Sequence, residues 1–441
     1  MTGTRYVADA VVPCGDVLTV LAPGVVDVDD GGRIAWVGTE SDAPDRPDWT
    51  VHRRAGLLLP GLVNVHCHSP MTLLRGQGEG LPLSRWLAEV IWPREARIGP
   101  DDVYWGMLLA SGELLRYGVT TTVEMYFHDE EMIAAVEASG ARCVLTPGVV
   151  VAPGWERFGP WEQQVERITA LHAARNGDQR IEIGFGPHSA YALPEPALAA
   201  IGEVARDLGA LVHTHLAETE HEGDEVSARH GGASVPEVLA GLGVFDGNRV
   251  LAAHAVWLSD ADLGLLARHD VAVAHCPGSN AKLASGNARL VPMLRAGLRV
   301  GLGTDGPASN DDLDLWEEVR LAALFARLEE HDPTALSAYD ALTLATRGGA
   351  AALGRDDIGV LAPGRWADMV LLDLADPGFV PVLADRDLVA HAVWSASRRL
   401  VRDVWVAGRL VVRDGECSTV DLAEAGHRVQ AAAARIAGQG L

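Results

Sequence analysis

Between about residues 58 and 355, short apolar runs alternate eight times with longer segments of helical periodicity. Parallel strands need a crossover of a dozen or more residues between them, and that crossover is usually a helix. Eight strand–helix units therefore predict an α/β chain whose central domain is a (β/α)8 TIM barrel. The expected strands cover residues 62–68, 119–125, 142–150, 181–189, 210–218, 248–255, 271–277 and 299–306.

The two ends of the chain follow a different pattern. Both contain short alternating runs broken by Gly, Pro and Asp, which is typical of strands and tight turns. In the second of them, VWVAGRLVV predicts a hairpin around Ala407 and Gly408. We expect both ends to build one small β-sandwich domain beside the barrel, followed by a terminal helix. The expected boundaries are 1–57 and 357–420 for the sandwich, 58–356 for the barrel and 421–441 for the helix.

Composition excludes several classes of function. A formal net charge of −24 argues against nucleic acid and against acidic membrane surfaces as partners. No apolar run is long enough to span a membrane, and the N-terminus lacks the basic-then-apolar layout of a signal peptide, so a cytoplasmic protein is expected. The five cysteines contain no CxxC pair, which argues against a disulfide framework or a thiolate zinc site.

Polar side chains recur where the expected barrel strands end. The first strand ends in His66 and His68, which lie two residues apart and so point the same way. A His-x-His pair alone fits a polar loop equally well. Barrel active sites, however, gather at the C-terminal ends of strands, and imidazole and carboxylate groups are common metal ligands. Further candidates at strand ends are His188, His215, Glu218, His254 and Asp305.

Five segments match, in order, the landmarks of the amidohydrolase superfamily: PGLVNVHCH, HTHLAE, AAHAVWL, HCPGSNAKLASG and GTDGPASND. The chain more narrowly resembles the branch that deaminates methylthioadenosine, S-adenosylhomocysteine and 5′-deoxyadenosine, which HSPMTLLRG and WPREARI support. The resemblance implies a barrel, a β-sandwich from both chain ends, and a small-molecule nucleoside substrate. It implies one divalent metal ion per subunit, zinc with iron or manganese as alternatives, bound by His66, His68, His215 and Asp305.

The chain contains a single lysine, Lys282, outside the expected strands. Many two-metal hydrolases on this scaffold bridge their metals with a modified lysine from a barrel strand, so a one-metal site is the simpler expectation.

The resemblance also implies roles in catalysis. Asp305 would take a proton from the attacking water, His254 would hold the direction of the attacking oxygen, and Glu218 would carry a proton to a ring nitrogen. For substrate binding, Glu95 matches the position that grips the ribose hydroxyls, and His188 matches a residue near ring and sugar. Trp92 is a candidate wall for the base.

Some of these residues have competing interpretations. His213 and His215 point inward on the same strand, and the HxxE spacing favours His215 as the ligand, which leaves His213 as a buried hydrogen-bonded residue. Asp305 could cap the helix that follows it, but Asp311 and Asp312 lie nearer the expected helix start. Glu218 could be a solvated acid at a helix start.

The function also has alternatives. A deaminase or chlorohydrolase of a free heterocycle, such as a guanine-like base or an s-triazine, would use nearly the same metal site. A non-catalytic barrel scaffold is a remote third possibility. The 5′ group of the substrate is left open by the loop at 148–165, where Arg157 is a candidate for an amino-acid tail and Trp155, Phe158 and Trp161 favour an apolar group. A homo-oligomer is possible, but no interface can be read.

Overall fold

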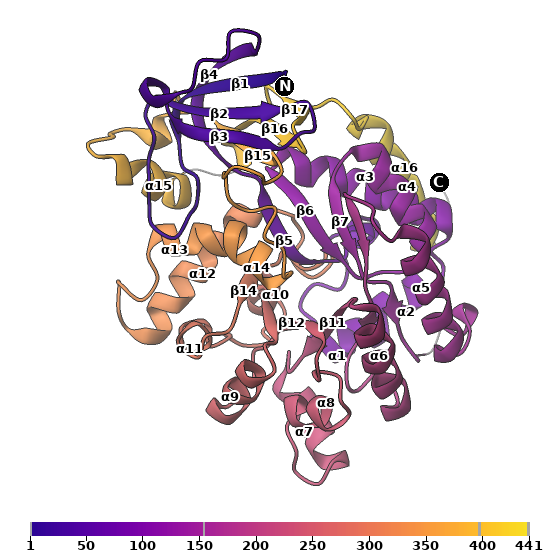
Figure 1. Ribbon diagram of the computed structural model, residues 1–441. Helices are drawn as coiled ribbons and strands as arrows, with labels where there is room; N and C mark the ends of the chain where they lie inside the picture. The colour runs from indigo at the N-terminus through magenta and orange to yellow at the C-terminus, as the bar shows by residue number, and fades with distance from the viewer. Residues whose placement is uncertain (1, 153–154, 396–397, 439–441) are drawn as a thin grey trace.

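The computed structural model describes residues 2–152, 155–395 and 398–438 (Figure 1). The central part of the chain contains two parallel four-stranded sheets, and all eight predicted strand positions are confirmed. The strands are β5 (Leu62–Cys67), β6 (Val119–Glu124), β7 (Arg142–Leu145), β9 (Ile181–Ile183), β11 (Leu211–Leu216), β12 (Arg249–His254), β13 (Ala272–His275) and β14 (Val300–Leu302).

Backbone hydrogen bonds join the two sheets at both seams. At one seam, Phe185 N donates to Leu211 O at 2.8 Å and Phe185 O accepts from His213 N at 2.9 Å. At the other seam, Asp305 N donates to His66 O at 3.0 Å. The connectivity β5-β6-β7-β9 and β11-β12-β13-β14, closed in this way, is consistent with the predicted barrel. Both seams lie next to candidate site residues.

Helices surround the strands (Figure 1). In α6, the buried residues Ala197, Leu198, Ile201 and Ala205 recur at helical spacing, so one face packs inward. The outer helices are α3 (Pro100–Arg116), α4 (Asp129–Ser139), α5 (Trp161–Arg175), α6 (Glu195–Leu208), α7 (Glu220–Arg229), α8 (Val235–Gly241), α9 (Asp260–Arg268), α11 (Leu290–Arg295), α12 (Leu315–Glu330), α13 (Ala338–Thr343) and α14 (Gly349–Ala352). Shorter helices near the strand ends are η2 (Ser69–Leu74), α1 (Leu83–Trp86), η3 (Leu87–Ile91), α2 (Trp92–Glu95) and α10 (Pro277–Lys282).

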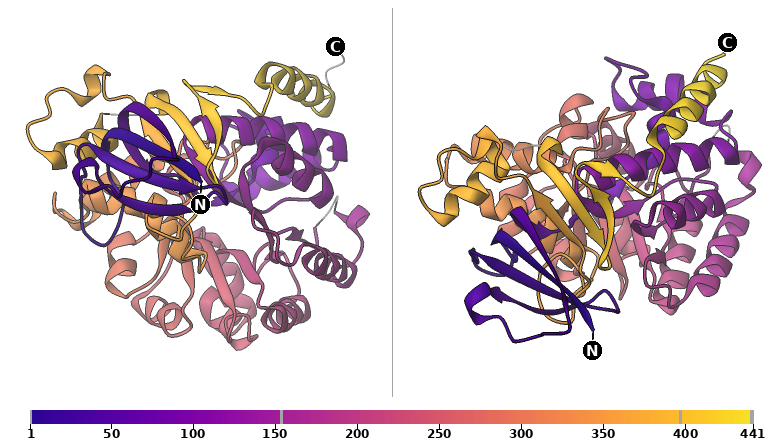
Figure 2. Two further views of the ribbon diagram at one scale, coloured as in Figure 1. Left: turned by 45° about the horizontal axis from the view of Figure 1, so that its top comes forward. Right: turned by 90° about the horizontal axis from the view of Figure 1, so that it is seen from above.

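The two chain ends share one eight-stranded sheet of order β18-β17-β16-β15-β4-β1-β2-β3. They meet where β4 pairs antiparallel with β15, and Figure 2 shows this sheet beside the strand–helix body. Its strands are β1 (Gly3–Val11), β2 (Gly24–Asp29), β3 (Ile34–Thr39), β4 (Thr50–Pro60), β15 (Met369–Leu372), β16 (Val401–Val406), β17 (Arg409–Arg413) and β18 (Glu416–Cys417). The division of this sheet into two sandwich layers stays a prediction.

The hairpin predicted in the second end is confirmed. β16 and β17 pair antiparallel, and the turn residues Ala407 and Gly408 have φ of +48° and +75°. A two-residue turn with positive φ at both positions matches the right-handed twist of the strands, and glycine adopts it without a steric penalty. Within the range expected for the terminal helix, α16 covers Leu422–Ile436 and packs on α3, and residues 439–441 lie outside the described residues.

The expected cap of α12 was wrong. The N-cap is Asp314, whose side chain accepts from Trp316 N at 3.0 Å, rather than Asp311 or Asp312. The helix begins later than its apolar periodicity suggests, so the carboxylate next to its first residue takes the cap. Across the described ranges, no helix has the length and apolar character needed to cross a membrane.

Candidate active site

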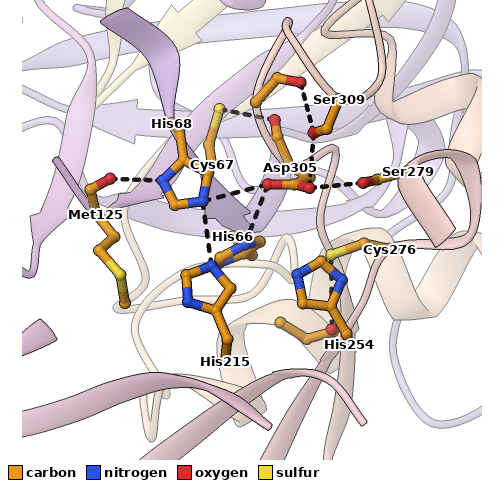
Figure 3. Close-up of polar contacts among 12 residues, drawn as sticks. His66, Cys67, His68, Met125, His215, His254, Cys276, Ser279, Asp305 and Ser309 are labelled. Atoms are coloured by element: carbon orange, nitrogen blue, oxygen red, sulfur yellow. Dashed lines mark hydrogen bonds and ion pairs between the residues drawn. The ribbon is translucent and has the colours of Figure 1, made fainter. Parts of the chain in front are cut away.

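The side chains of His66, His68, His215 and Asp305 converge at the ends of β5, β11 and β14 (Figure 3). Asp305 Oδ1 lies 3.3 Å from Nε2 of both His66 and His68. His68 Nε2 lies 3.3 Å from His215 Nε2. Two overlapping groups place their donor atoms within 4.8 Å of one another: His66, His68 and Asp305, and His66, His215 and His254.

Backbone carbonyls determine the tautomers of two imidazoles. His68 Nδ1 donates to Met125 O at 2.5 Å, and His215 Nδ1 donates to His188 O at 2.8 Å. Because each proton sits on Nδ1, both Nε2 atoms carry lone pairs. These lone pairs face each other across 3.3 Å, an arrangement that a cation between them would stabilise.

A chain of hydrogen bonds determines the third tautomer. Thr146 Oγ1 donates to Glu124 O at 3.0 Å, so it accepts from His213 Nδ1 at 2.9 Å. His213 Nε2 then accepts from His66 Nδ1 at 2.8 Å, and the lone pair of His66 lies on Nε2. None of the described residues hydrogen-bonds that atom. Burial lowers the pKa of His66 to about 3, so the ring is neutral. His213 is fully buried and hydrogen-bonded, as predicted.

Asp305 presents one carboxylate oxygen to His66 and His68. Its Oδ2 accepts from Ser279 Oγ at 2.6 Å and from Ser309 Oγ at 2.7 Å, which leaves Oδ1 toward His66. Three imidazoles and one carboxylate fit the donor set of a divalent cation.

His254 and Glu218 lie beside this donor set. His254 ends β12 with a φ of +69°, a strained backbone for a residue other than glycine. Its Nδ1 donates to Asn280 Oδ1 at 2.9 Å, and its Nε2 lies 3.7 Å from Glu218 Oε2. Burial, and then the charge of Asp305, raise the pKa of Glu218 well above its usual range. The Glu218 carboxyl group therefore holds its proton more tightly than an exposed glutamate does, which suits a proton donor.

A cavity with about 670 Å³ of empty space opens over these groups. His66 lies beneath it, fully buried, and Glu95 is 5% exposed. Burial raises the pKa of Glu95 to about 7, against the opposing effects of Tyr126 and Arg157. Besides His66, the sequence predicted eight catalytic, metal-binding or substrate-binding residues, and all eight line the cavity: His68, Trp92, Glu95, His188, His215, Glu218, His254 and Asp305.

Sequence reasoning missed the residues that hold these groups in place. Ser279 and Ser309 hold Asp305, and Asn280 holds His254. These residues stand in the segments HCPGSNAKLASG and GTDGPASND, which carry the family resemblance. A signal was therefore present, but serine and asparagine in loops are too common to suggest a role. Of the candidates in the 148–165 loop, Trp155 lines the cavity, whereas Arg157 does not.

Comparisons with known proteins agree with the family resemblance of the sequence motifs. Residues 57–411 match the amidohydrolase family. A 5′-deoxyadenosine deaminase of Methanothermobacter thermautotrophicus is 41% identical over 416 residues, covering 94% of this chain and 95% of that protein. A 5-methylthioadenosine/S-adenosylhomocysteine deaminase of Pelotomaculum thermopropionicum is 40% identical over 395 residues, 89% of each. The structure of an adenosine deaminase from Xanthomonas campestris with bound zinc has a TM-score of 0.93 and 35% identity, covering 99% of this chain and 98% of that one.

Proposed function

The chain belongs to the amidohydrolase family, and on that basis we propose that it is a metal-dependent deaminase of adenosine-type nucleosides. It is a hydrolase of C–N bonds that converts the adenine ring of its substrate to the hypoxanthine ring and releases ammonia. The observation that carries this proposal is the convergence of His66, His68, His215 and Asp305 beside Glu218, whose pKa burial raises well above its usual range. The relatives named above supply the reaction class.

We propose one divalent ion per chain, held by His66, His68, His215 and Asp305. Zinc suits this set, and iron and manganese accept similar ligands. When bound, such an ion makes a water molecule acidic enough to act as a nucleophile near neutral pH. The Nδ1 atom of each imidazole donates to a fixed acceptor, so the neutral ring presents the lone pair of its Nε2 to the site.

The remaining steps are assigned to acids and bases of the chain. His254 Nε2 directs the water oxygen toward the carbon that carries the amino group, and Asp305 accepts the proton of that water. As the new C–O bond forms, Glu218 donates its proton to the adjacent ring nitrogen, which makes the carbon electrophilic. The C–N bond then breaks as the amino group takes the proton held by Asp305 and leaves as ammonia, while the remaining hydroxyl proton returns to Glu218 and the C=O bond forms.

Glu95 favours a nucleoside over a free heterocycle. Its carboxylate is buried in the wall of the cavity and forms no ion pair with a basic side chain among the described residues, so ionising it costs free energy. Two vicinal hydroxyl groups of a ribose would offset that cost by donating to its two oxygens. His188 and Trp92 complete the proposed contacts to sugar and base. A non-catalytic scaffold would have no need for this full set of donors.

We also propose that the terminal sheet forms a β-sandwich. A separate buried cluster joins apolar residues of β1 and β2 to residues of β15 and β16, among them Val26, Val28, Met369 and Trp405. Such a cluster is expected if the sheet folds over on itself. A cytoplasmic location, homo-oligomerisation, and the absence of nucleic-acid and membrane partners stay predictions.

A substrate panel tests the proposed function. The zinc-loaded protein is incubated with adenine nucleosides, with guanine and adenine as free bases, and with an s-triazine, and ammonia is measured. We expect release from the nucleosides and at most trace release from the others. The Glu95→Gln variant should raise the KM for nucleosides at least about tenfold, the order expected for losing a charge-assisted contact to two hydroxyls. Deamination of free bases only, unaffected by this substitution, would establish the alternative function.

A further inference from the structure

The wall of the cavity is mostly apolar around Glu95. Aliphatic and aromatic side chains from η2, α1, η3 and the 148–165 loop form it: Met71, Leu83, Leu87, Ile91, Val150 and Trp155. Among the described residues, neither lysine nor arginine lines this cavity. The carboxyl groups that line it belong to Glu95, Glu218 and Asp305. A negatively charged group on a ligand would therefore find no lysine or arginine partner in this lining.

Arg157 is the residue that the sequence offers as a partner for a charged 5′ group. Its guanidinium, however, already donates to backbone carbonyl groups. Its Nη1 donates to Ala96 O at 3.0 Å and to Ile98 O at 3.1 Å, and its Nη2 donates to Glu95 O at 2.8 Å. The guanidinium carbon also lies 4.7 Å from the ring centre of Phe158. Arg157 thus fixes the chain that leaves α2 and holds the backbone of Glu95, rather than facing a ligand.

A second, outer pocket shares Leu83, Leu87, Trp92, Tyr191 and Leu283 with the cavity. Its charged lining is acidic and comes from α7: Glu220, Glu222 and Glu225. A ligand that extends outward past Trp92 would meet these carboxylates. An anionic group would therefore be disfavoured both inside the cavity and in the pocket next to it.

Resting on the proposed function, we propose that the enzyme selects nucleosides whose 5′ group is uncharged, such as 5′-deoxyadenosine and methylthioadenosine. It discriminates against substrates that carry a carboxylate or a phosphate beyond the 5′ carbon. S-adenosylhomocysteine carries such a carboxylate, together with an ammonium group, and adenosine 5′-monophosphate carries a phosphate. The selectivity arises because the carboxylate or phosphate would lose its hydration on entering the cavity and would gain no cationic partner from the protein.

Steady-state kinetics of the zinc-loaded protein test this selectivity. We expect kcat/KM for 5′-deoxyadenosine and methylthioadenosine to exceed that for S-adenosylhomocysteine and for the monophosphate on the order of a hundredfold, the kind of ratio that an unpaired polar group produces. A ratio of about ten or more supports the proposal. A smaller ratio for either charged substrate overturns it.

The Arg157→Met variant separates the two possible roles of this arginine. If Arg157 holds the backbone of Glu95, the substitution lowers kcat/KM for 5′-deoxyadenosine and for S-adenosylhomocysteine by the same factor. A selective loss of S-adenosylhomocysteine turnover would show that the guanidinium binds the amino-acid carboxylate, against the proposal. Arg175→Met is the matched control, since Arg175 pairs with Glu137 and Asp178 on the outer surface and lines neither pocket.

Failure of the selectivity is distinguishable from failure of the proposed function. Comparable turnover of charged and uncharged nucleosides overturns the selectivity and leaves the deaminase assignment intact. If no adenine nucleoside releases ammonia, the deaminase assignment fails, and calorimetric binding to the zinc-loaded protein still tests the selectivity. Tighter binding of 5′-deoxyadenosine than of S-adenosylhomocysteine, by about tenfold or more, supports it; a smaller difference contradicts it.

Discussion

At the scale of single residues, the site depends on where three imidazole protons sit. His66 depends on His213, because the Nδ1 proton of His66 has His213 Nε2 as its acceptor at 2.8 Å. Thr146 fixes the tautomer of His213 in turn, so a side-chain hydroxyl helps to determine which nitrogen of His66 faces the site. Outer partners of metal ligands commonly matter almost as much as the ligands themselves.

We therefore expect His213→Leu to weaken zinc binding by about 10- to 100-fold, because His66 loses the acceptor that fixes its tautomer. His213→Gln retains a carbonyl acceptor and should recover part of the affinity. Competition with a chelator measures both values, and His172→Leu, on the outer helix α5, serves as control. If the leucine variant binds zinc with wild-type affinity, His213 does not control the tautomer of His66.

The raised pKa of Glu95 makes a prediction about pH. With a pKa of about 7 in the folded protein against 4.5 ordinarily, Glu95 takes up a proton as the pH falls below 7. The folded chain then holds a proton that the unfolded chain has lost, so Glu95 contributes less stability as the pH rises from about 4.5 to 7. The charged form is the better acceptor for ribose hydroxyls, so kcat/KM for nucleosides should fall on the acid side of pH 7.

A pH profile of kcat/KM, recorded for the wild type and for Glu95→Gln, checks this prediction. The glutamine variant should lose the part of the acid limb that belongs to Glu95 and show a flatter profile. An acid limb of the same position and depth in both proteins would assign it to another group.

Residue types at strand ends were predictable, and their supports were not. Seven of the nine candidate residues stood out because they stand where expected strands end, at one end of the expected barrel. Glu95 and Trp92 lie between two expected strands, in the segment WPREARI that supports the family resemblance. The contacts of Ser279, Ser309 and Asn280 join loops that follow different strands, and no local pattern encodes such a contact. Arg157 shows the same limit, since only the structure reveals that its guanidinium faces carbonyl groups.

At the scale of elements, α12 supports the loops that carry the site. Its residue Glu318 is fully buried and accepts from Gly278 N at 2.8 Å and from Asn310 Nδ2 at 2.9 Å. Gly278 begins the short helix α10, which bears Ser279 and Asn280, and a Cβ at Gly278 would lie 2.3 Å from Glu318 Oε1. Glu318 therefore acts on the site through α10.

Glu318→Leu should leave two buried donors without an acceptor, at a cost of about 1–3 kcal/mol each. We expect kcat to fall about tenfold or more while KM changes little, because α10 then holds Asp305 and His254 less well. Glu318→Gln keeps one acceptor oxygen and should be milder in both kcat and unfolding midpoint. A leucine variant that folds and retains kcat within twofold would remove Glu318 from this role.

Strand positions were easier to predict than element ends. The run at 142–150 was read as one strand, but β7 stops at Leu145 and the run resumes as β8 (Gly148–Val149). Pro147 interrupts it because proline has no N–H for the ladder. The cap of α12 was misplaced for a related reason: several carboxylates stand near the start, and only the backbone geometry selects Asp314.

At the scale of the whole molecule, a buried ion pair ties the ring of strands to the terminal sheet. Arg142 on β7 is fully buried, and its Nε and Nη2 donate to the Asp368 carboxylate at 3.0 and 3.2 Å. Asp368 directly precedes β15 and also accepts from Ala407 N at 2.6 Å. That both chain ends enter one sheet was predictable from their alternation, whereas this connection was not.

Arg142→Met should destabilise the fold by about 3–5 kcal/mol, since Asp368 would stay buried as an unpaired charge. Urea unfolding of the metal-loaded protein measures the change. Arg175→Met, which removes an exposed pair, should cost less than about 1 kcal/mol. A loss for Arg142→Met no larger than that of this control would mean that the pair does not couple the two parts.

The central claim is that His66, His68, His215 and Asp305 hold one cation that makes this chain a nucleoside deaminase. Titration of the metal-free protein with zinc, while ammonia release from 5′-deoxyadenosine is followed, tests it most directly. The account predicts negligible release without metal, a linear rise to one zinc ion per chain, and no further gain beyond. Full activity in the metal-free protein, or no activity at any zinc concentration, would contradict it.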